Sequence, residues 1–349
     1  MIVLRGKKIC MPEPCVLAVG KFECFHLGHK ELVGEMMHLA RRKLPACHCE
    51  KRSGECCVAE VVQQKPLLSN GPGLLCDVAS ALVMFEPHPY RVLAAPDYKP
   101  LFTNCEREYL ACELGADYLL EYPFDQKFAA MQPEDFCRIL FEDLRAQAVV
   151  VGEGYRFGHK RTGTVNTLRQ MAVEYGSQVH VVAPHRANSV SSETGSSKTS
   201  TSTIRELLLA NKFSEAEGLL GYSFFMMGTV SHGRKLGRTI GFPTINLYPS
   251  WEKFLPVDGV YATRVFIDGR IYNSITNIGL CPTVESAGAS RSVETHLFDF
   301  TGGELYGKRV RVEFLRFIRP ERKFESLDAL KSQIVIDCKH INTQLIQKP

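Results

Sequence analysis

The strongest constraint on this chain's fold is that the spacing of its apolar residues changes part-way along. In the first half, short and nearly continuous apolar runs are separated by stretches in which apolar residues recur every three or four positions. Strands that alternate with helices in this way predict a parallel sheet covered on both faces, with ligands bound beyond the carboxyl ends of the strands. The runs are residues 16–20, 81–85, 116–120, 148–152 and 179–183, and the helix-like stretches are residues 28–42, 106–114, 133–144 and 165–175.

From Phe224 onward the sequence reads as strands alone. Asp268-Gly269 is a strong signal for a tight hairpin turn. A helix-like stretch at residues 326–341 follows the last strand-like run. This half therefore predicts a small antiparallel β-barrel closed by a helix. The strand-like runs are residues 259–267, 270–278, 292–300 and 310–317.

Two segments interrupt this order. Residues 44–76 show no clear periodicity and are expected to form an insertion, and the Ser- and Thr-rich residues 187–203 are expected to form a loop. Thr203 and Ser214 each stand three residues before a glutamate, which is a capping-box pattern, and Gly221 is a plausible helix stop. We therefore expect an α/β domain over 1–186, a loop and helical connector over 187–220, and an all-β domain over 221–349.

The composition excludes several classes of protein. Of 349 residues, 45% are hydrophobic and 23% are charged, and no apolar stretch approaches the roughly 18 residues that span a bilayer. The first residues lack a secretory signal, so the 13 cysteines are expected to be reduced thiols in a cytoplasmic protein. From Gly221 onward 17 Lys and Arg outnumber 12 Asp and Glu, which suits a phosphate-bearing ligand and is too weak for nucleic acid. We expect no nucleic-acid or membrane partner, and a monomer or weak homo-oligomer.

The first candidate site is His26-Leu27-Gly28-His29, which follows a strand and opens a helix. Two imidazoles at positions i and i+3 share one face of a helix, and the free N–H groups at a helix start favour phosphate. The motif therefore favours the triphosphate of a nucleotide. The alternatives are two partly exposed histidines or a metal pair.

Three further segments of the first half lie where a strand ends or a helix begins. Residues 85–89 (Phe-Glu-Pro-His-Pro) follow a strand and are either ligand-facing or an ordinary turn. Residues 152–158 contain glycines that permit close approach of a ligand, and Arg156 and Arg161 are candidates for phosphate, although a glycine-rich connector competes with this interpretation. Residues 200–205 (Ser-Thr-Ser-Thr-Ile-Arg) either bind phosphate or only cap a helix.

The second half holds a glycine-rich, basic segment at residues 228–246. Backbone N–H groups of such a loop can hold phosphate, and Thr244 and Asn246 lie two apart on an extended stretch, so their oxygens can ligate Mg²⁺ beside it. No GxxxxGK[ST] pattern is present, and a plain glycine-rich turn is the alternative. Farther on, Glu294, His296 and Asp299 lie on or near one strand, where a carboxylate can take the proton of an attacking hydroxyl. A solvent-facing glutamate is the alternative there.

Together these motifs resemble those of the bacterial bifunctional riboflavin kinase/FAD synthetases. The resemblance runs in the family's order along nearly the whole chain. The matching segments of the first half are residues 20–29, 85–89, 151–158 and 200–205. Those of the second half are residues 228–246, 255–262, 277–279, 282–283, 293–300, 306–307 and 319–324.

The resemblance implies two reactions and two folds. A C-terminal six-stranded antiparallel barrel would transfer the γ-phosphate of ATP to the 5′-hydroxyl of riboflavin, giving FMN. An N-terminal Rossmann-like nucleotidylyltransferase domain with a parallel sheet would adenylate FMN to FAD with release of pyrophosphate. The implied ligands are ATP with Mg²⁺, riboflavin, FMN and FAD.

The resemblance also implies a role for each motif. Glu294 would be the catalytic base of the kinase and His26 and His29 the catalytic residues of adenylyl transfer, while Thr244 and Asn246 would hold Mg²⁺. The other residues implied to bind ATP or phosphate are Gly20, Phe22, Glu23, Gly28, Ser202, Arg205, Gly233, Lys235, Gly237, Arg238 and Gly241. Those implied to bind flavin are Phe85, His88, Asn277 and Arg319.

The departures from the family fall in the first half. The family has Phe-Asp-Gly where this chain has Phe22-Glu23-Cys24, so Cys24 would lose the freedom of glycine in a tight turn. It has Asn or Asp where this chain has Gly154, so a polar contact to the ligand is missing. We expect FMN formation to be intact and FAD formation to be slower. The alternative is a riboflavin kinase whose N-terminal domain is degenerate for adenylyl transfer.

Two other functions and one metal site compete with these assignments. The first half could act on a different phosphate ester, such as a pantetheine or nicotinate nucleotide, or the chain could bind flavin without catalysis. The presence of Glu294, Thr244 and Asn246 argues against the non-catalytic alternative. Zinc is not expected at residues 47–57, because the spacing of their cysteines and histidine matches no standard zinc pattern.

Overall fold

The computed structural model describes residues 1–41, 60–62, 78–185, 199–233, 237, 240–281 and 290–345. Its contacts divide the chain into two compact units, Met1–Thr199 and Ser200–Pro349. Each unit is described by itself. The cysteines at residues 47–57 and most of the expected insertion lie outside the described residues.

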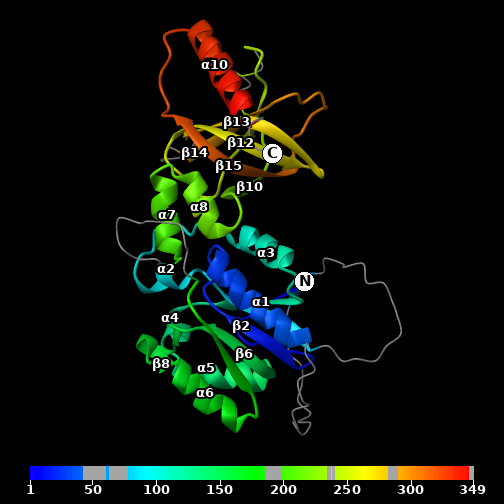
Figure 1. Ribbon diagram of the computed structural model, residues 1–349, viewed down its shortest axis with the longest axis vertical. Helices are drawn as coiled ribbons and strands as arrows, with labels where there is room; N and C mark the ends of the chain where they lie inside the picture. The colour runs from blue at the N-terminus through cyan, green and yellow to red at the C-terminus, as the bar shows by residue number, and fades with distance from the viewer. Residues whose placement is uncertain are drawn as a thin grey trace, which may run out of the picture. The chain divides into compact units, whose positions relative to one another are not determined.

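The first unit is built on a sheet of six parallel strands with one antiparallel strand at its edge (Figure 1). The expected parallel sheet is confirmed. Four of the five apolar runs became inner strands whose two faces are both buried, and the run at 179–183 became a partly exposed edge strand. Two strands were not predicted: β1, which pairs in parallel with β5, and the short β3, which pairs antiparallel with β1. In spatial order the strands are β3 (Glu60–Val62), β1 (Ile2–Arg5), β5 (Tyr118–Pro123), β4 (Ala79–Glu86), β2 (Cys15–Val19), β6 (Ala146–Gly152) and β9 (Gln178–Val182).

Helices cover both faces of this sheet, as the alternating sequence predicts (Figure 1). Helix α1 (Leu27–Arg41) packs on β2, β4 and β6. On the other face Phe136, Leu140 and Leu168 join the core formed by alternate strand residues. The other helices of this unit are α2 (Pro89–Leu93), α3 (Asn104–Glu113), α4 (Gln126–Ala129), α5 (Pro133–Arg138) with the π-helical turn η1 (Ile139–Asp143), and α6 (Val165–Glu174). Between β6 and α6 lie the two-residue strands β7 (Arg156–Phe157) and β8 (Gly163–Thr164) and the 3₁₀ turn η2 (His159–Arg161).

The second unit is a six-stranded antiparallel sheet, and an isolated bridge from Ser231, just after one edge strand, to Asn246 on the other brings the two edges together. This confirms the expected barrel architecture. Asp268 and Gly269 both have positive φ in the turn between β12 and β13, as the hairpin signal predicts. In spatial order the strands are β10 (Phe225–Thr229), β15 (Arg309–Arg319), β12 (Gly259–Ile267), β13 (Arg270–Cys281), β14 (Ser290–Leu297) and β11 (Thr244–Leu247).

The closing helix is α10 (Leu327–Leu345), which packs on the barrel through Ile341 and Cys338. The segment before the barrel forms two helices of this unit, α7 (Thr201–Leu209) and α8 (Phe213–Leu220). The capping boxes expected at Thr203 and Ser214 are wrong, because α7 is capped by the Ser200 hydroxyl and α8 begins after Lys212 without a side-chain cap. Gly221 does end α8, with φ +72°.

Among the described residues, no helix is long and apolar enough to cross a membrane.

Candidate functional site

The loop between β2 and α1 carries the first group of candidate residues. Phe22 and Phe25 are fully buried at φ +40° and +41°, whereas Cys24 has no positive φ. The expectation that Cys24 suffers from the loss of glycine's freedom is therefore wrong, because the left-handed conformation falls on Phe22 and Phe25 instead. Cys24 itself is fully buried.

Buried contacts of Glu23 hold this loop in place. Its carboxylate accepts hydrogen bonds from the Tyr98 hydroxyl at 2.8 Å and from the Leu101 N–H at 2.9 Å, and the His88 Nε2 lies 3.3 Å away. Glu23, His88 and Phe22 are all buried, and none lines the pocket described below. In this structure these three predicted binding residues hold the loop in place.

His26 and His29 stand together at the start of α1. Their rings are stacked with centroids 3.8 Å apart, and the His26 Nδ1 accepts a hydrogen bond from the His29 N–H at 3.3 Å. Gly28 leaves room for this stack, since a Cβ there would lie 3.3 Å from the His26 ring. Burial lowers the pKa of His26 to about 4, and burial together with His26 lowers the pKa of His29 well below its ordinary value. Both imidazoles are therefore neutral near pH 7, so they offer hydrogen bonds to a phosphate and not positive charge.

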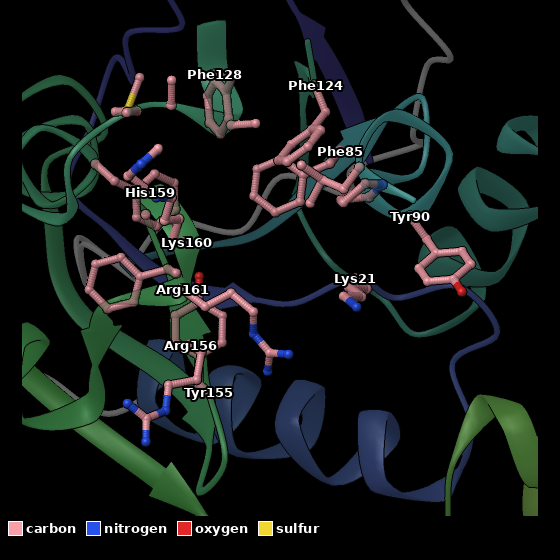
Figure 2. A pocket seen from close by; sticks show the side chains of 18 of the residues that line it. Lys21, Phe85, Tyr90, Phe124, Phe128, Tyr155, Arg156, His159, Lys160 and Arg161 are labelled. Atoms are coloured by element: carbon pink, nitrogen blue, oxygen red, sulfur yellow. The ribbon is translucent and has the colours of Figure 1, made fainter. Parts of the chain in front are cut away.

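A pocket of about 540 Å³ opens beside this loop (Figure 2). Phe85, Phe124 and Phe128 form one wall, and Tyr155, Arg156 and Arg161 lie across from them. Of the residues predicted from sequence, Gly20, Phe85, Arg156 and Arg161 line the pocket, and the segment 154–158 supplies part of the opposite wall. The other labelled residues in Figure 2 are Lys21, Tyr90, His159 and Lys160.

The charge of this pocket is one-sided. Lys21, Arg156, His159, Lys160 and Arg161 line it, and no Asp or Glu is among its described lining residues. Burial and the nearby Arg161 lower the pKa of Lys21, as expected where cations crowd together. An aromatic wall facing several cations suits a flat apolar ring that carries a phosphate. The basic run 159–161 and Lys21 are visible in the sequence, but nothing local there indicates that they face the same cavity as the three phenylalanines.

Gly154 also lines this pocket, and it has open space around it. A Cβ there would meet nothing within 4 Å, and the residue has no positive φ. The structure thus has room for the asparagine or aspartate that the resemblance leads one to expect.

Ser202 and Arg205 belong to the second unit by its contacts. Ser202 is exposed on α7, and the Arg205 guanidinium lies 4.7 Å from the centre of the Phe254 ring. Their expected part in binding ATP at the first unit therefore stays a prediction.

The second unit brings several predicted residues into one row across neighbouring strands. Asn246 on β11 pairs with Glu294 on β14, and Glu294 pairs with Asn277 on β13. Thr244 lies two residues from Asn246, so its side chain leaves the same face of the strand. A pocket of about 300 Å³ is lined by Gly237, Thr244, Asn277, Glu294 and Arg319, among others. With His296, six residues chosen from sequence are thus assembled here, whereas Asn246 and Asp299 are not among the lining residues.

Two glycines of the 228–246 segment are required by close contacts. A Cβ on Gly233 would lie 2.3 Å from the Asn246 amide nitrogen, and a Cβ on Gly237 would lie 2.3 Å from the Phe242 carbonyl oxygen. Gly241 has φ +86°, a conformation that favours glycine. Lys235 and Arg238 lie outside the described residues.

Helix α10 holds one side of this pocket. The Arg319 Nε donates to the Asp337 carboxylate at 3.0 Å, and a second Arg319 nitrogen lies 2.9 Å from the same oxygen. The Asn277 amide donates to Glu321 at 3.0 Å. Asp337 and Glu321 were not predicted, because their roles depend on where the helix and the 319–324 segment dock.

Comparison with known proteins decides the family. Residues 220–345 match the model described as riboflavin kinase, and residues 76–197 match the one described as FAD synthetase. The bifunctional riboflavin kinase/FMN adenylyltransferase of Escherichia coli K12 is 33% identical over 333 residues, which cover 93% of this chain and 91% of the relative. This chain belongs to that family.

Two further similar proteins also match almost the whole chain. The Bacillus subtilis enzyme with the same description is 30% identical over 326 residues, covering 92% of this chain and 90% of the relative. A crystal structure described as a macrolide-efflux protein from Streptococcus pneumoniae superposes with a TM-score of 0.75 at 27% identity, covering 98% of this chain and 99% of the other. The family's two-part architecture thus extends along almost the whole of the chain.

Proposed function

We propose that this chain makes FAD from riboflavin in two steps. The second unit phosphorylates riboflavin with ATP to give FMN, and the first unit adenylates FMN to FAD with release of pyrophosphate. The family membership supports both activities. The observation that carries the assignment is the first-unit pocket, whose aromatic wall faces a set of cations without any acidic residue in its described lining.

In the kinase reaction, Glu294 takes the proton from the 5′-hydroxyl of riboflavin as that oxygen attacks the γ-phosphorus of ATP. This role is supported by its place in the pocket lining and by its pairing with Asn246 and Asn277 on the neighbouring strands. Arg319, held by Asp337, and Asn277, held by Glu321, border the flavin. The loop that contains Gly233, Gly237 and Gly241 covers the nucleotide.

The kinase site fits Mg²⁺. The Thr244 hydroxyl, the Asn246 amide oxygen and the Glu294 carboxylate are oxygen donors, which hard divalent cations prefer. We propose that Thr244 and Asn246 hold the ion, which when bound neutralises part of the phosphate charge. The Gly233 backbone packs directly on the Asn246 side chain and so restricts its position.

In the adenylyl transfer, a phosphate oxygen of FMN attacks the α-phosphorus of ATP and pyrophosphate leaves. We propose that the phenylalanine wall receives the isoalloxazine ring, and that Arg156, Lys160 and Arg161 receive the FMN phosphate. His26 and His29 donate hydrogen bonds to the ATP phosphates beside the N-terminus of α1, whose free N–H groups add to the attraction. We expect this step to be slower than FMN formation, because Gly154 offers no side chain to the ligand.

We further propose that the enzyme works in the cytoplasm as a monomer or weak homo-oligomer. Seven described cysteines, including the buried Cys15 and Cys24, are free of disulfides, which agrees with a reducing compartment.

The test is a pair of assays on one preparation of the full chain. Riboflavin with Mg-ATP should yield FMN, and FMN with Mg-ATP should yield FAD and pyrophosphate, each separated by chromatography. Glu294→Gln should abolish FMN formation while riboflavin still binds and FMN is still converted to FAD. Glu304→Gln, an exposed glutamate of the same unit, is the matched control. FMN formation by E294Q at the wild-type rate would show that Glu294 is not the catalytic base. Failure of the wild-type chain to form FAD would refute the assignment of adenylyl transfer to the first unit.

A further inference from the structure

Cys24, His26 and His29 form a cluster in which the proposed chemistry uses the two histidines but not the cysteine. One ligand atom from each residue can be chosen so that all three lie within 4.8 Å of one another. The Cys24 thiol is buried and in no disulfide, and His26 is 8% exposed. A thiol is not needed for binding phosphate, so a different ligand chemistry has to account for this combination.

A second observation points to a ligand at the same place. The Nδ1 atom of His29 is shielded from solvent and has no hydrogen-bond partner. Buried polar atoms are nearly always paired, so an unpaired imidazole nitrogen beside a thiol and a second imidazole indicates a site that something else completes.

The donor set is that of a transition-metal site. Thiolate sulfur and imidazole nitrogen are the ligands that Zn²⁺ prefers, and three protein ligands with one open position are a common zinc arrangement. Tetrahedral zinc places such ligand atoms about 3.3–3.6 Å apart. Shifts on the order of 1 Å from the present arrangement therefore suffice.

Coordination requires one local rearrangement. The two rings now lie nearly parallel, at 15° to each other, so their lone pairs cannot meet at one ion. Rotation about the Cβ–Cγ bond of one histidine removes this obstacle, and that torsion is soft. If His26 rotates, it gives up the long 3.3 Å hydrogen bond that it accepts from the His29 N–H and its stack on the His29 ring.

We propose that Cys24, His26 and His29 bind one Zn²⁺ ion, and that the bound ion inhibits FAD formation. The inhibition rests on the proposed adenylyl transfer, because zinc would withdraw the two imidazoles that otherwise donate to the ATP phosphates. FMN formation takes place in the other unit and does not use these residues, so zinc leaves it unchanged. The metal-binding part of the proposal does not depend on either activity.

The binding experiment uses the full chain, freed of metal by a chelator and titrated with Co²⁺ as a coloured substitute for Zn²⁺. Because Cys47, Cys49, Cys56 and Cys57 could bind metal themselves, all four are first changed to serine. This background protein should bind one Co²⁺ with a thiolate-to-cobalt charge-transfer band, and one Zn²⁺ by elemental analysis. Adding Cys24→Ser, which keeps the side chain's size, should remove the band, and Cys24→Gly should do the same. Cys112→Ser, at an exposed cysteine, should leave the band intact.

The inhibition experiment measures both half-reactions in free-zinc buffers. Zinc should lower the rate of FAD formation and not that of FMN formation, and Cys24→Ser should raise the half-inhibiting zinc concentration by at least about tenfold. A background protein that binds no metal, or a band that survives Cys24→Ser, would overturn the site. If FAD formation is absent even in chelator, the proposed function fails, while the cobalt band still decides the metal site.

Discussion

Replacing Gly233 with alanine should damage the kinase while leaving FAD formation from FMN intact. The new Cβ would lie 2.3 Å from the Asn246 amide nitrogen, whereas an ordinary contact is at least 3.4 Å, so one side must move by about 1.1 Å. Asn246 has little freedom to move, because it is only 6% exposed and its backbone carbonyl accepts a hydrogen bond of 2.8 Å from the Ser231 N–H.

A misplacement of about 1 Å in a positioned catalytic group costs roughly 10²-fold in rate, or about 2.7 kcal/mol. The assay is the initial rate of FMN formation from riboflavin and Mg-ATP at saturating substrates. Conversion of FMN to FAD by the same preparation reports whether the first unit is folded, and riboflavin binding reports whether the second unit is. Gly303→Ala is the matched control, because its Cβ would meet nothing within 4 Å. A G233A rate within about twofold of wild type would refute the argument that this glycine positions Asn246 for catalysis.

Three further changes test other parts of the structure. Gly154→Asn should add one hydrogen bond to FMN, worth about 1 kcal/mol, and so lower the KM for FMN about fivefold in the FAD assay. The control Gly152→Asn lies outside the pocket lining and should leave the KM unchanged, so an equal effect of both variants would contradict the reasoning. Arg161→Gln should weaken FMN binding by roughly 10–150-fold through loss of a charge-assisted hydrogen bond, measured by calorimetry, whereas the exposed Arg138→Gln should bind FMN normally. Thr263→Val should lower the free energy of unfolding by about 1–3 kcal/mol, measured by urea denaturation, because the buried Thr263 hydroxyl forms hydrogen bonds of 2.7 Å with the hydroxyls of Ser274 and Thr276. The control is Thr229→Val at an exposed position, and equal urea midpoints for the two variants would contradict this prediction.

The predicted elements succeeded where burial leaves a periodic trace. β4 and β6 are nearly continuous apolar runs, as expected of strands buried on both faces. The second half of β12 alternates buried and partly exposed residues, as expected of a strand buried on one face. The four residues of β1 are too few to show a period, and they became a strand because β5 offers a parallel partner. The two capping-box predictions were wrong because a Ser/Thr-x-x-Glu pattern occurs inside helices as well as at helix starts, so the pattern alone does not locate the first residue of a helix.

The candidate sites divide in the same way. The residues that the kinase pocket gathers, such as Thr244, Asn277 and Glu294, stand in distinctive local motifs and could be chosen from the sequence. Asp337 and Glu321 could not, because they hold Arg319 and Asn277 only where helix α10 and the 319–324 segment dock. Glu23 reads as a binding residue in its motif, and only its contacts with Tyr98 and Leu101 reveal that it supports the loop.

By itself, the sequence determined two fold classes, the order of the motifs and the residue types available for phosphate chemistry, because periodicity and short motifs are local properties of the chain. The tertiary structure alone decided which of those residues share a cavity. It placed Lys21 and Arg161 in one pocket with Phe85, packed Gly233 against Asn246, and brought Cys24 to His26 and His29. Each of these contacts is set by strand register, loop conformation or helix docking, which depend on many distant residues at once.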